Sequence, residues 1–500
     1  MDNFLPIVLT RLINLGIDLH KEHCGLSTSR CDRRRRPEWT HGRGALGYGR
    51  MECGYLRARR PGRWCSSFVY GDFPGTIVDL GAAGHPFGVA SPAFRALDLE
   101  AHGLRWRNAP YPMAHPLEGA PAGILHGSLA DTAADLGADA QAWRRLHGHI
   151  VRHIDEHVDN ALTPLVRWPE RPVRLAQFGA AGVLPASSLA RAAFRTPQAR
   201  ALFAGSAVHA ITSPTSPLTS AFGLLFGGLG MTRGWPVVEG GTGALIDALL
   251  NLLRSHHARL HTGCEVTDLR ERPPADATIL NLTPRQIMRL GGLELRGGTR
   301  RSLARWRYGS AVFKVDFHLS EPVPWADPRV GQAGTVHVGG TLEEICGAEG
   351  DVGKRRMPKR PLVLACQQFV ADPSRGQTLW TYAHVPRGYV ERYPSEVTEL
   401  IAAQIERFAP GFRDTILATH ATSPAALERW NPNLVGGDIA GGAMTGLQTL
   451  LRPRFSTHPH RLAPGVFMAS SSAAPGAGVH GMPGWWAAEE ALSAWNDAAK

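Results

Sequence analysis

The chain has 500 residues, 43% of them hydrophobic, and a formal net charge of +11. This length exceeds one ordinary hydrophobic core, so two domains are expected. Residues 1–65 carry a net charge of +7 and the rest of the chain only +4, so the basic balance does not by itself predict a nucleic-acid-binding protein. A nucleic-acid-binding arm around Arg33–Arg36 is kept as an alternative, although such blocks are usually solvated tails.

The cysteines and the apolar runs indicate the compartment. Beyond residue 65 only Cys264, Cys346 and Cys366 occur, far apart and without C-x-x-C spacing. Neither a disulfide framework nor a zinc site is predicted from them, which suits a cytoplasmic location. The apolar run Phe4–Gly16 is interrupted by Arg11 and is too short to cross a membrane.

The first 64 residues show little hydrophobic periodicity. Gly42 to Gly47 has the letter spacing G-x-G-x-x-G, which marks a dinucleotide-binding turn only where an apolar strand precedes it. No apolar strand precedes Gly42, so we reject this motif.

Helical and strand patterns alternate from residue 65 onward. The clearest helix spans 138–162, where apolar residues recur at three- and four-residue spacing. Strand patterns between 311 and 385 indicate an antiparallel sheet, whereas 92–162 is assigned to loops and helices. The other expected elements are helices over 184–209 and 397–408, an apolar helix pair over 217–231, and strands over 311–318, 362–369 and 378–385.

Several histidines lie in the helical pattern at 138–162. His149, His153 and His157 fall on one helical face. No carboxylate–histidine signature accompanies them and basic residues surround them, so an exposed polar face is expected rather than a ligand set. No metal site is predicted in the chain.

The most informative stretch lies near the C-terminus. Residues 463–486 run A-P-G-V-F-M-A-S-S-S-A-A-P-G-A-G-V-H-G-M-P-G-W-W. This pattern predicts an apolar strand, a loop of small residues, and a helix that begins near Gly481. A loop without bulky side chains lets a flat ligand approach the backbone, and the helix start directs free N–H groups toward it.

This stretch resembles the carboxy-terminal flavin-binding segment of the phytoene desaturase-like flavoproteins. Three upstream segments are similar to the same family: V-D-L-G-A-A-G-H-P at 78–86, P-V-V-E-G-G-T-G-A-L-I at 236–246, and N-P-N followed by G-G-D-I at 431–439. A strand over 258–269 and a return to the sheet over 275–284 also match. The resemblance covers residues 65–495, and agreement across separate segments is harder to obtain by chance than one motif.

The resemblance implies an α/β fold in which an FAD/NAD(P)-binding Rossmann-like domain is interleaved with an α+β substrate domain. The opening βαβ unit of that domain is absent or scrambled here. The implied parts are an aberrant segment 1–64, FAD-binding pieces 65–90, 237–300 and 425–500, and substrate-domain pieces 91–236 and 301–424.

The resemblance also implies the cofactor and its contacts. FAD is the expected cofactor, with the backbone of Val266 facing the adenine. Backbone groups of Gly481 and Met482 would face the flavin, and His85 and His480 would either line the flavin or cap a turn. No catalytic residue is assigned. The expected cofactor-binding residues are Val266, Gly476, Val479, His480, Gly481 and Met482.

A frameshift explains the missing opening unit. If the reading frame is shifted by one base, Trp39 must become Gly, and Asp32 to Thr40 can encode I-V-G-A-G-P-N-G-L. That segment is a strand end followed by the glycine turn that holds a dinucleotide. Arg59 or Arg60 can become Asp at the position expected for the ribose ligand, and Trp64 must become Gly. Family-like sequence resumes near Cys65.

The sequence therefore predicts an FAD-dependent oxidoreductase, phytoene dehydrogenase-like, that moves a hydride between an apolar organic substrate and flavin. The alternative is a non-functional or decayed product of such a gene that cannot bind FAD. The expected partner is a small apolar organic molecule and not a nucleic acid, and peripheral contact with a membrane is left open.

Overall fold

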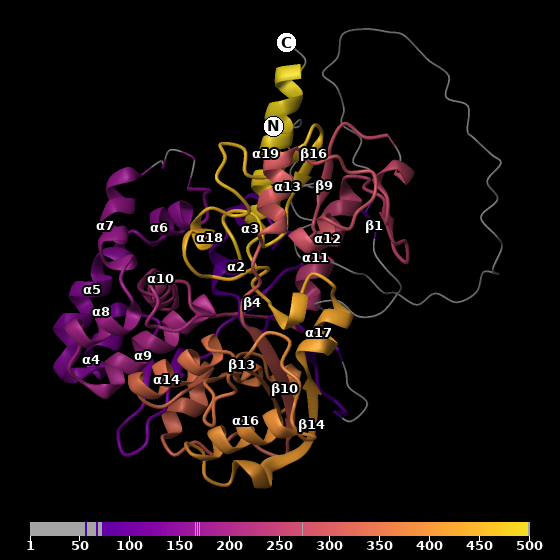
Figure 1. Cartoon of the computed structure of the whole chain (residues 1–500). Helices are drawn as coiled ribbons and strands as arrows, with labels where there is room; N and C mark the ends of the chain where they lie inside the picture. The colour runs from indigo at the N-terminus through magenta and orange to yellow at the C-terminus, as the bar shows by residue number, and fades with distance from the viewer. Residues whose placement is uncertain are drawn as a thin grey trace.

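The computed structural model describes residues 56–57, 67–68, 73–165, 167, 169, 171–272 and 274–498. The frameshift prediction at codons 32–40 and at Arg59, Arg60 and Trp64 lies outside the described residues. In Figure 1 a large sheet forms the lower half, a group of helices lies to its left, and the C-terminal helix α19 stands above the sheet.

The large sheet has seven strands in the order β14-β10-β13-β12-β11-β5-β6. Most neighbours are antiparallel, as expected, but β11 pairs with β5 in parallel. Strands β5 and β6 arise from the stretch assigned to loops and helices; four of the five residues of β5 are buried, so no polar alternation marks it as a strand. The strands are β5 (Tyr111–His115), β6 (Gly123–Leu125), β10 (Ala311–Leu319), β11 (Ala333–Val338), β12 (Val363–Cys366), β13 (Thr378–Val385) and β14 (Ile416–Thr422).

The helices on the left of Figure 1 come from residues 129–230. The helix expected over 138–162 is two helices, because His153 leaves the helical conformation with φ −123° and ψ 32°. The pair expected over 217–231 is the single helix α10, and 184–209 forms two helices. Their bounds are α4 (Leu129–Asp135), α5 (Ala140–Arg152), α6 (Ile154–Ala161), α7 (Pro172–Gly182), α8 (Ala186–Ala193), α9 (Pro197–Ala207) and α10 (Thr219–Gly230).

The upper half of the molecule contains short strands. Strand β16 (Val466–Met468) pairs in parallel with β9 (Thr278–Leu280) and antiparallel with β15 (Arg461–Ala463). The strand expected over 258–269 is reduced to β8 (Leu260–His261), which pairs in parallel with β1 (Leu56–Arg57). The remaining short strands are β2 (Ser67–Phe68), β3 (Val78–Asp79), β4 (Trp106–Arg107) and β7 (Val237–Val238).

The other helices connect and cover these sheets. Helix α14 begins with a capping box in which Thr341 and Glu344 exchange hydrogen bonds. Helix α19 begins at Met482, where the sequence pattern places it. The bounds are α2 (Pro86–Ala90), α3 (Pro92–Ala96), α11 (Gly243–Ser255), α12 (Pro284–Ile287), α13 (Gly297–Ala304), α14 (Leu342–Gly353), α15 (Gln368–Ala371), α16 (Glu396–Glu406), α17 (Pro424–Trp430), α18 (Leu447–Leu450) and α19 (Met482–Ala498).

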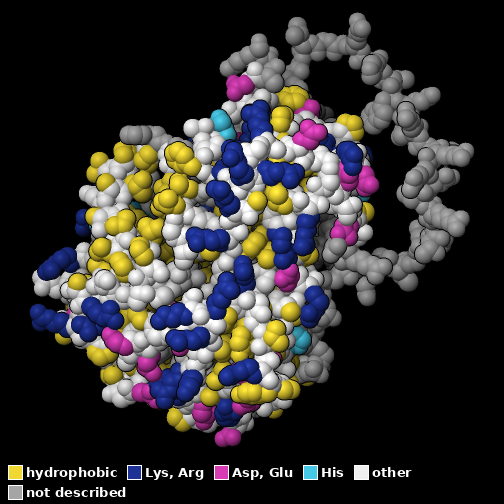
Figure 2. Space-filling view, in the orientation of Figure 1, with side chains coloured by type: hydrophobic (Ala, Val, Ile, Leu, Met, Phe, Trp, Pro, Cys, Tyr) yellow, Lys and Arg dark blue, Asp and Glu magenta, His cyan; other side chains and the backbone are white. Residues whose placement is uncertain are grey.

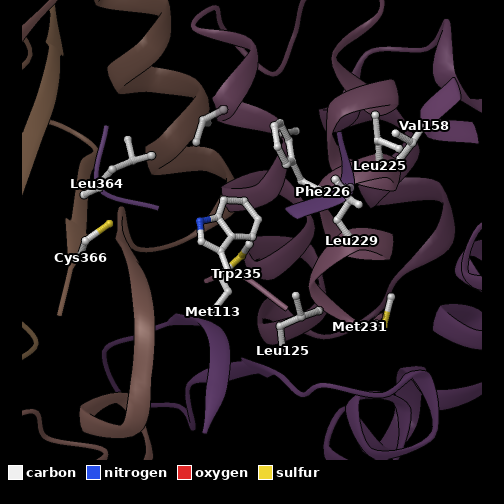
Figure 3. Packing of buried hydrophobic residues seen from close by; sticks show 14 of the residues in the cluster. Met113, Leu125, Val158, Leu225, Phe226, Leu229, Met231, Trp235, Leu364 and Cys366 are labelled. Carbon is white, nitrogen blue, oxygen red and sulfur yellow. The ribbon is translucent and has the colours of Figure 1, made fainter. Parts of the chain in front are cut away.

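The two faces of the large sheet belong to different hydrophobic clusters. One face, with Phe313 and Phe317, packs with residues of α16. The other face contributes to the largest cluster, which joins the sheet to the left-hand helices. In Figure 3, Trp235 lies at the centre of this cluster beside Met113, with Cys366 on one side and Phe226 on the other. The second face is therefore the one that meets the rest of the molecule.

Across the described part of the chain, no helix combines the length and apolar character needed to cross a bilayer.

Candidate functional site

The glycine-rich loop between β16 and α19 requires its glycines. Gly476, Gly478 and Gly481 have φ values of +121°, +136° and +67°, a region that side-chain-bearing residues rarely adopt. A Cβ added to Gly481 would also lie 3.0 Å from the ring of Phe94. The backbone of this loop is thus held close to α3 with no side chain between them.

The loop is fixed against α2 and α3 through His480. Ser91 Oγ donates to the His480 carbonyl at 2.7 Å, and the rings of Phe87 and His480 meet edge to face at 5.7 Å. Burial lowers the pKa of His480 to about 4, so its neutral Nδ1 accepts the N–H of Met482 at 3.1 Å. This side chain therefore caps the turn, and the Met482 N–H is used within the loop.

Five of the six expected cofactor-binding residues are neighbours in the sequence and lie in this loop or at the first position of α19. They are Gly476, Val479, His480, Gly481 and Met482. Val266 lies outside any strand and packs against a separate cluster that contains Leu269 and Ile287.

A buried arginine lies beneath the loop. The guanidinium of Arg452 donates to the carbonyls of Ser471 at 2.9 Å and Gly442 at 2.7 Å. A Cβ added to Gly476 would lie 3.2 Å from Arg452 Nη1. Burial lowers the pKa of Arg452 to about 10, so the group stays cationic at neutral pH. It places a positive charge next to the loop that the sequence assigns to the flavin.

A second buried network holds the segment that follows β3. The Asp79 carboxylate accepts from Arg375 at 2.9 Å, from Gln368 at 2.6 Å and from the Thr242 N–H at 2.8 Å. Asp79 and Arg375 are both fully buried. Gln368 lies in α15, Arg375 lies between α15 and β13, and Thr242 lies at the start of α11. The network therefore fixes Asp79 between these two parts of the chain.

His85 continues this network. Its Nε2 lies 3.0 Å from Thr242 Oγ1 and its backbone N–H donates to Pro236 at 2.8 Å. Burial lowers its pKa to about 4. Its Nδ1 is enclosed and has no hydrogen-bond partner among the described residues, so one buried polar atom here is available to a ligand.

The inner face of the large sheet carries polar side chains. By strand register Asp316 pairs with Trp380 and Lys314 with Tyr382, and all four residues are buried. Lys314 donates to Asp316, and its ammonium lies 5.5 Å from the centre of the Trp380 ring. The Trp380 indole in turn donates to the Asp79 carbonyl at 2.9 Å. The lysine therefore lies where the sheet meets the segment 79–85.

Lys314 is a candidate functional residue that sequence reasoning missed. Burial lowers its pKa, and the Asp316 carboxylate opposes that shift. A buried lysine with a lowered pKa is a common device for proton transfer. The only sequence signal was a lysine and an aspartate at alternate positions in an otherwise apolar strand.

The histidines of α5 and α6 differ from expectation. His157 is buried and its ring lies 5.4 Å from Phe178, while His147 stacks on Trp143 at 4.2 Å. The exposed polar face predicted for this helix is thus wrong for His157, because the break at His153 turns α6 toward α7. Within the described ranges no group of three or more His, Cys, Asp or Glu residues could hold a metal ion.

In its fold the chain is similar to several solved oxidases and oxidoreductases. A putrescine oxidase solved with putrescine aligns with a TM-score of 0.55 at 14% identity, over 89% of this chain and 93% of that one. Cyclohexylamine oxidase from Brevibacterium oxydans gives 0.51 at 13% identity, over 89% and 93%. An oxidoreductase from Methanosarcina mazei gives 0.53 at 14% identity, over 88% and 93%.

Sequence comparison identifies distant relatives. The chain is 26% identical over 327 residues to pyridine nucleotide-disulfide oxidoreductase domain-containing protein 2 of Rattus norvegicus, covering 55% of each protein. The Mus musculus protein of that name is 25% identical over 351 residues, covering 60% of this chain and 59% of the relative. The chain thus spans little more than half the length of these relatives. No protein-family model matches it.

Proposed function

We propose that this chain is built as an FAD-dependent oxidoreductase of the phytoene desaturase-like type, which moves a hydride between an apolar organic substrate and flavin. The observation that carries the proposal is the presence of two features in a fold similar to that of solved amine oxidases. One is the glycine loop 476–482 above Arg452, and the other is the buried Lys314 on the inner sheet face. The names of the structural neighbours, which are amine oxidases, support the same chemistry.

The described residues fit the flavin end of FAD. The backbone of the loop packs closely on Arg452 and Phe94, where a Cβ on Gly476 or Gly481 would lie 3.2 Å and 3.0 Å away, and His85 Nδ1 is an enclosed atom without a described partner. Gly476, Val479 and Gly481 would hold the flavin, and Val266 would face the adenine. Bound FAD would supply the hydride acceptor, since the cofactor carries the redox chemistry in such enzymes.

The chain's own residues would orient the reactants and move protons. Arg452 keeps a fixed positive charge beside the loop, and a preorganised charge stabilises negative charge that develops nearby. Lys314 can hold or release a proton at Nζ, with Asp316 as its partner. The apolar wall formed by Trp235, Phe226 and Met113 would exclude water.

The test of the proposed function uses the chain with the frame restored between codons 29 and 65. This protein should bind FAD, and the flavin band should bleach when the protein is mixed without oxygen with long-chain amines or conjugated polyenes. Retention of FAD with no bleaching by either group would contradict the proposed chemistry. Failure to bind FAD would support the alternative, a decayed gene product.

Lys314→Met in the frame-restored protein tests the role of the lysine. The variant should keep its flavin and lose roughly 10²–10⁴-fold in the rate of flavin reduction, the range expected for a proton-transferring group. Stopped-flow absorbance measures the rate, and its pH profile should lose one ionisation. Unchanged rates and an unchanged pH profile would remove Lys314 from the mechanism.

Membrane contact is proposed for the surface of α7. Val173, Val183 and Leu184 expose 66%, 52% and 41% of their surface, and Figure 2 shows hydrophobic side chains gathered over this region with Lys and Arg at its margins. The carbonyls of Val183 and Leu184 accept hydrogen bonds from the start of α10. Helix α10 leads inward to Phe226, whose ring lies 4.8 Å from Phe87.

Changing Val173 and Leu184 together to Glu should weaken binding to vesicles that contain anionic lipid at least tenfold. Burying each side chain contributes about 1.5–3 kcal/mol, and about 1.4 kcal/mol is tenfold. Co-sedimentation measures the bound fraction. Leu417→Glu, at a side chain 61% exposed on β14, is the matched control and should bind like the parent. An equal loss of vesicle binding in the α7 variant and in the control would show that the surface of α7 is not a specific membrane-binding site.

A further inference from the structure

A strongly basic surface surrounds Trp306, whose ring lies 5.5 Å from the guanidinium of Arg452. Residues 285–309 contain seven arginines and a single acidic residue, Glu294. Figure 2 shows Lys and Arg side chains spread over the region that α12 and α13 occupy in Figure 1, with few acidic ones among them. This concentration is unlike the remainder of the chain after residue 65, whose charges nearly balance.

Two of these arginines are open to a ligand. Arg285 pairs with Glu428. Arg289 and Arg305 are exposed, and neither forms an ion pair with a carboxylate in the part of the chain that the structure describes. Unpaired guanidinium groups offer the fork geometry that matches phosphate oxygens.

Two hollows adjoin each other at Trp306. One, of about 290 Å³, is bordered by Arg285, Arg289, Trp306 and Tyr308. The other, of about 250 Å³, is bordered by Arg305, Trp306 and Gln448. Arginine and an aromatic ring at the edge of the same hollow can receive both parts of a nucleotide, since guanidinium groups bind phosphate and a base stacks on an aromatic ring.

The indole of Trp306 is held rigidly. Its Nε1 donates to the Gly441 carbonyl at 3.1 Å. A Cβ on Gly442 would lie 2.3 Å from the ring, so the ring rests directly on backbone. Tyr308 is also fixed, because its hydroxyl donates to Thr283 Oγ1 at 3.1 Å. A platform that is already ordered spends little conformational entropy when a flat ligand binds.

We propose that this surface binds a nucleoside diphosphate, with the base against Trp306 and the phosphates on Arg289 and Arg305. The site adjoins Arg452, but Arg289, Arg305 and Trp306 are not among the residues proposed to hold the flavin. The same ADP group occurs in free nucleotides and in pyridine dinucleotides, and the experiment separates these two sources.

The probe is 1,N⁶-etheno-ADP, whose fluorescence anisotropy reports binding to the full chain. Arg289→Gln with Arg305→Gln should weaken binding at least tenfold. Arg144→Gln with Arg145→Gln, two exposed arginines on α5, is the matched control and should change it less than twofold. Trp306→Leu should also weaken binding, and circular dichroism of each variant confirms that it is folded.

Competition identifies the ligand. Unlabelled ADP should displace the probe and tripolyphosphate should displace it at least tenfold less well, because it lacks a base. If ADP displaces the probe at a lower concentration than NADPH does, the ligand is a free nucleotide. If NADPH displaces it at the lower concentration, the ligand is a pyridine dinucleotide. Absence of binding at about 1 mM probe, a dissociation constant that corresponds to a binding free energy of about −4 kcal/mol, would overturn the proposal. Displacement by tripolyphosphate at the same concentration as ADP would also overturn it. Displacement by single-stranded DNA or by FAD at tenfold lower concentrations than ADP would overturn it too.

Discussion

Purified as encoded, the chain is expected to be colourless, and the chain with its frame restored between codons 29 and 65 is expected to be yellow. The pyrophosphate of a dinucleotide rests on a glycine turn and the helix start that follows it. An arginine-rich segment offers charge, but it cannot reproduce a close backbone turn that needs glycine. Each lost charge-assisted hydrogen bond weakens binding by roughly 1.5–3 kcal/mol, so two or three lost bonds reduce affinity by several orders of magnitude.

Absorbance between 370 and 460 nm after denaturation and release measures the flavin content of both proteins. The gene sequence is the control, because the shifted codons must spell a strand and glycine turn between positions 32 and 40. A flavin band near one equivalent in the unshifted protein would contradict the prediction. Codons that encode no such turn would remove the frameshift explanation altogether.

Arg375→Met is expected to lower the free energy of unfolding by about 3–5 kcal/mol, the cost of leaving one partner of a buried ion pair uncompensated. Asp79 and Arg375 are fully buried and lie 2.9 Å apart, and Arg375 also donates to Gln368 at 2.9 Å. Removing the guanidinium leaves the Asp79 carboxylate in the core without its cation. Urea unfolding followed by tryptophan fluorescence gives the free energy.

Arg413→Met is the matched control, because Arg413 pairs with Glu399 at 2.9 Å while both side chains are well exposed. This change should cost less than about 1 kcal/mol. Arg375→Lys should fall between the two, since lysine keeps the charge but cannot donate as a planar fork. Equal losses for Arg375→Met and Arg413→Met would show that the buried network does not stabilise the fold as described.

Local patterns predicted several elements, among them a strand whose residues are all buried. The expected strand over 378–385 is β13, and the helix expected near Gly481 begins at Met482. Strand β5 was missed because it contains Pro112 and shows no apolar–polar alternation, two features that argue against a strand. The break at His153 was missed since the apolar spacing continues through it.

The candidate site was predictable only where it is continuous in sequence. Residues 476–482 form one loop and were found together. Asp79 and Arg375 lie 296 positions apart, and Lys314 becomes notable only once the register places it beside Tyr382 and near Trp380. Such groupings depend on tertiary packing, which one sequence without its relatives does not reveal.

All seven strands of the large sheet come from residues 111–125 and 311–422. None of them depends on the segment in which the reading frame is suspect. A frameshift in that segment would therefore abolish ligand binding and leave the fold in place. Because cellular proteases degrade unfolded chains, the folded product would not be degraded rapidly. Such a protein would persist in the folded state, and selection could retain it for another ligand that its surface binds.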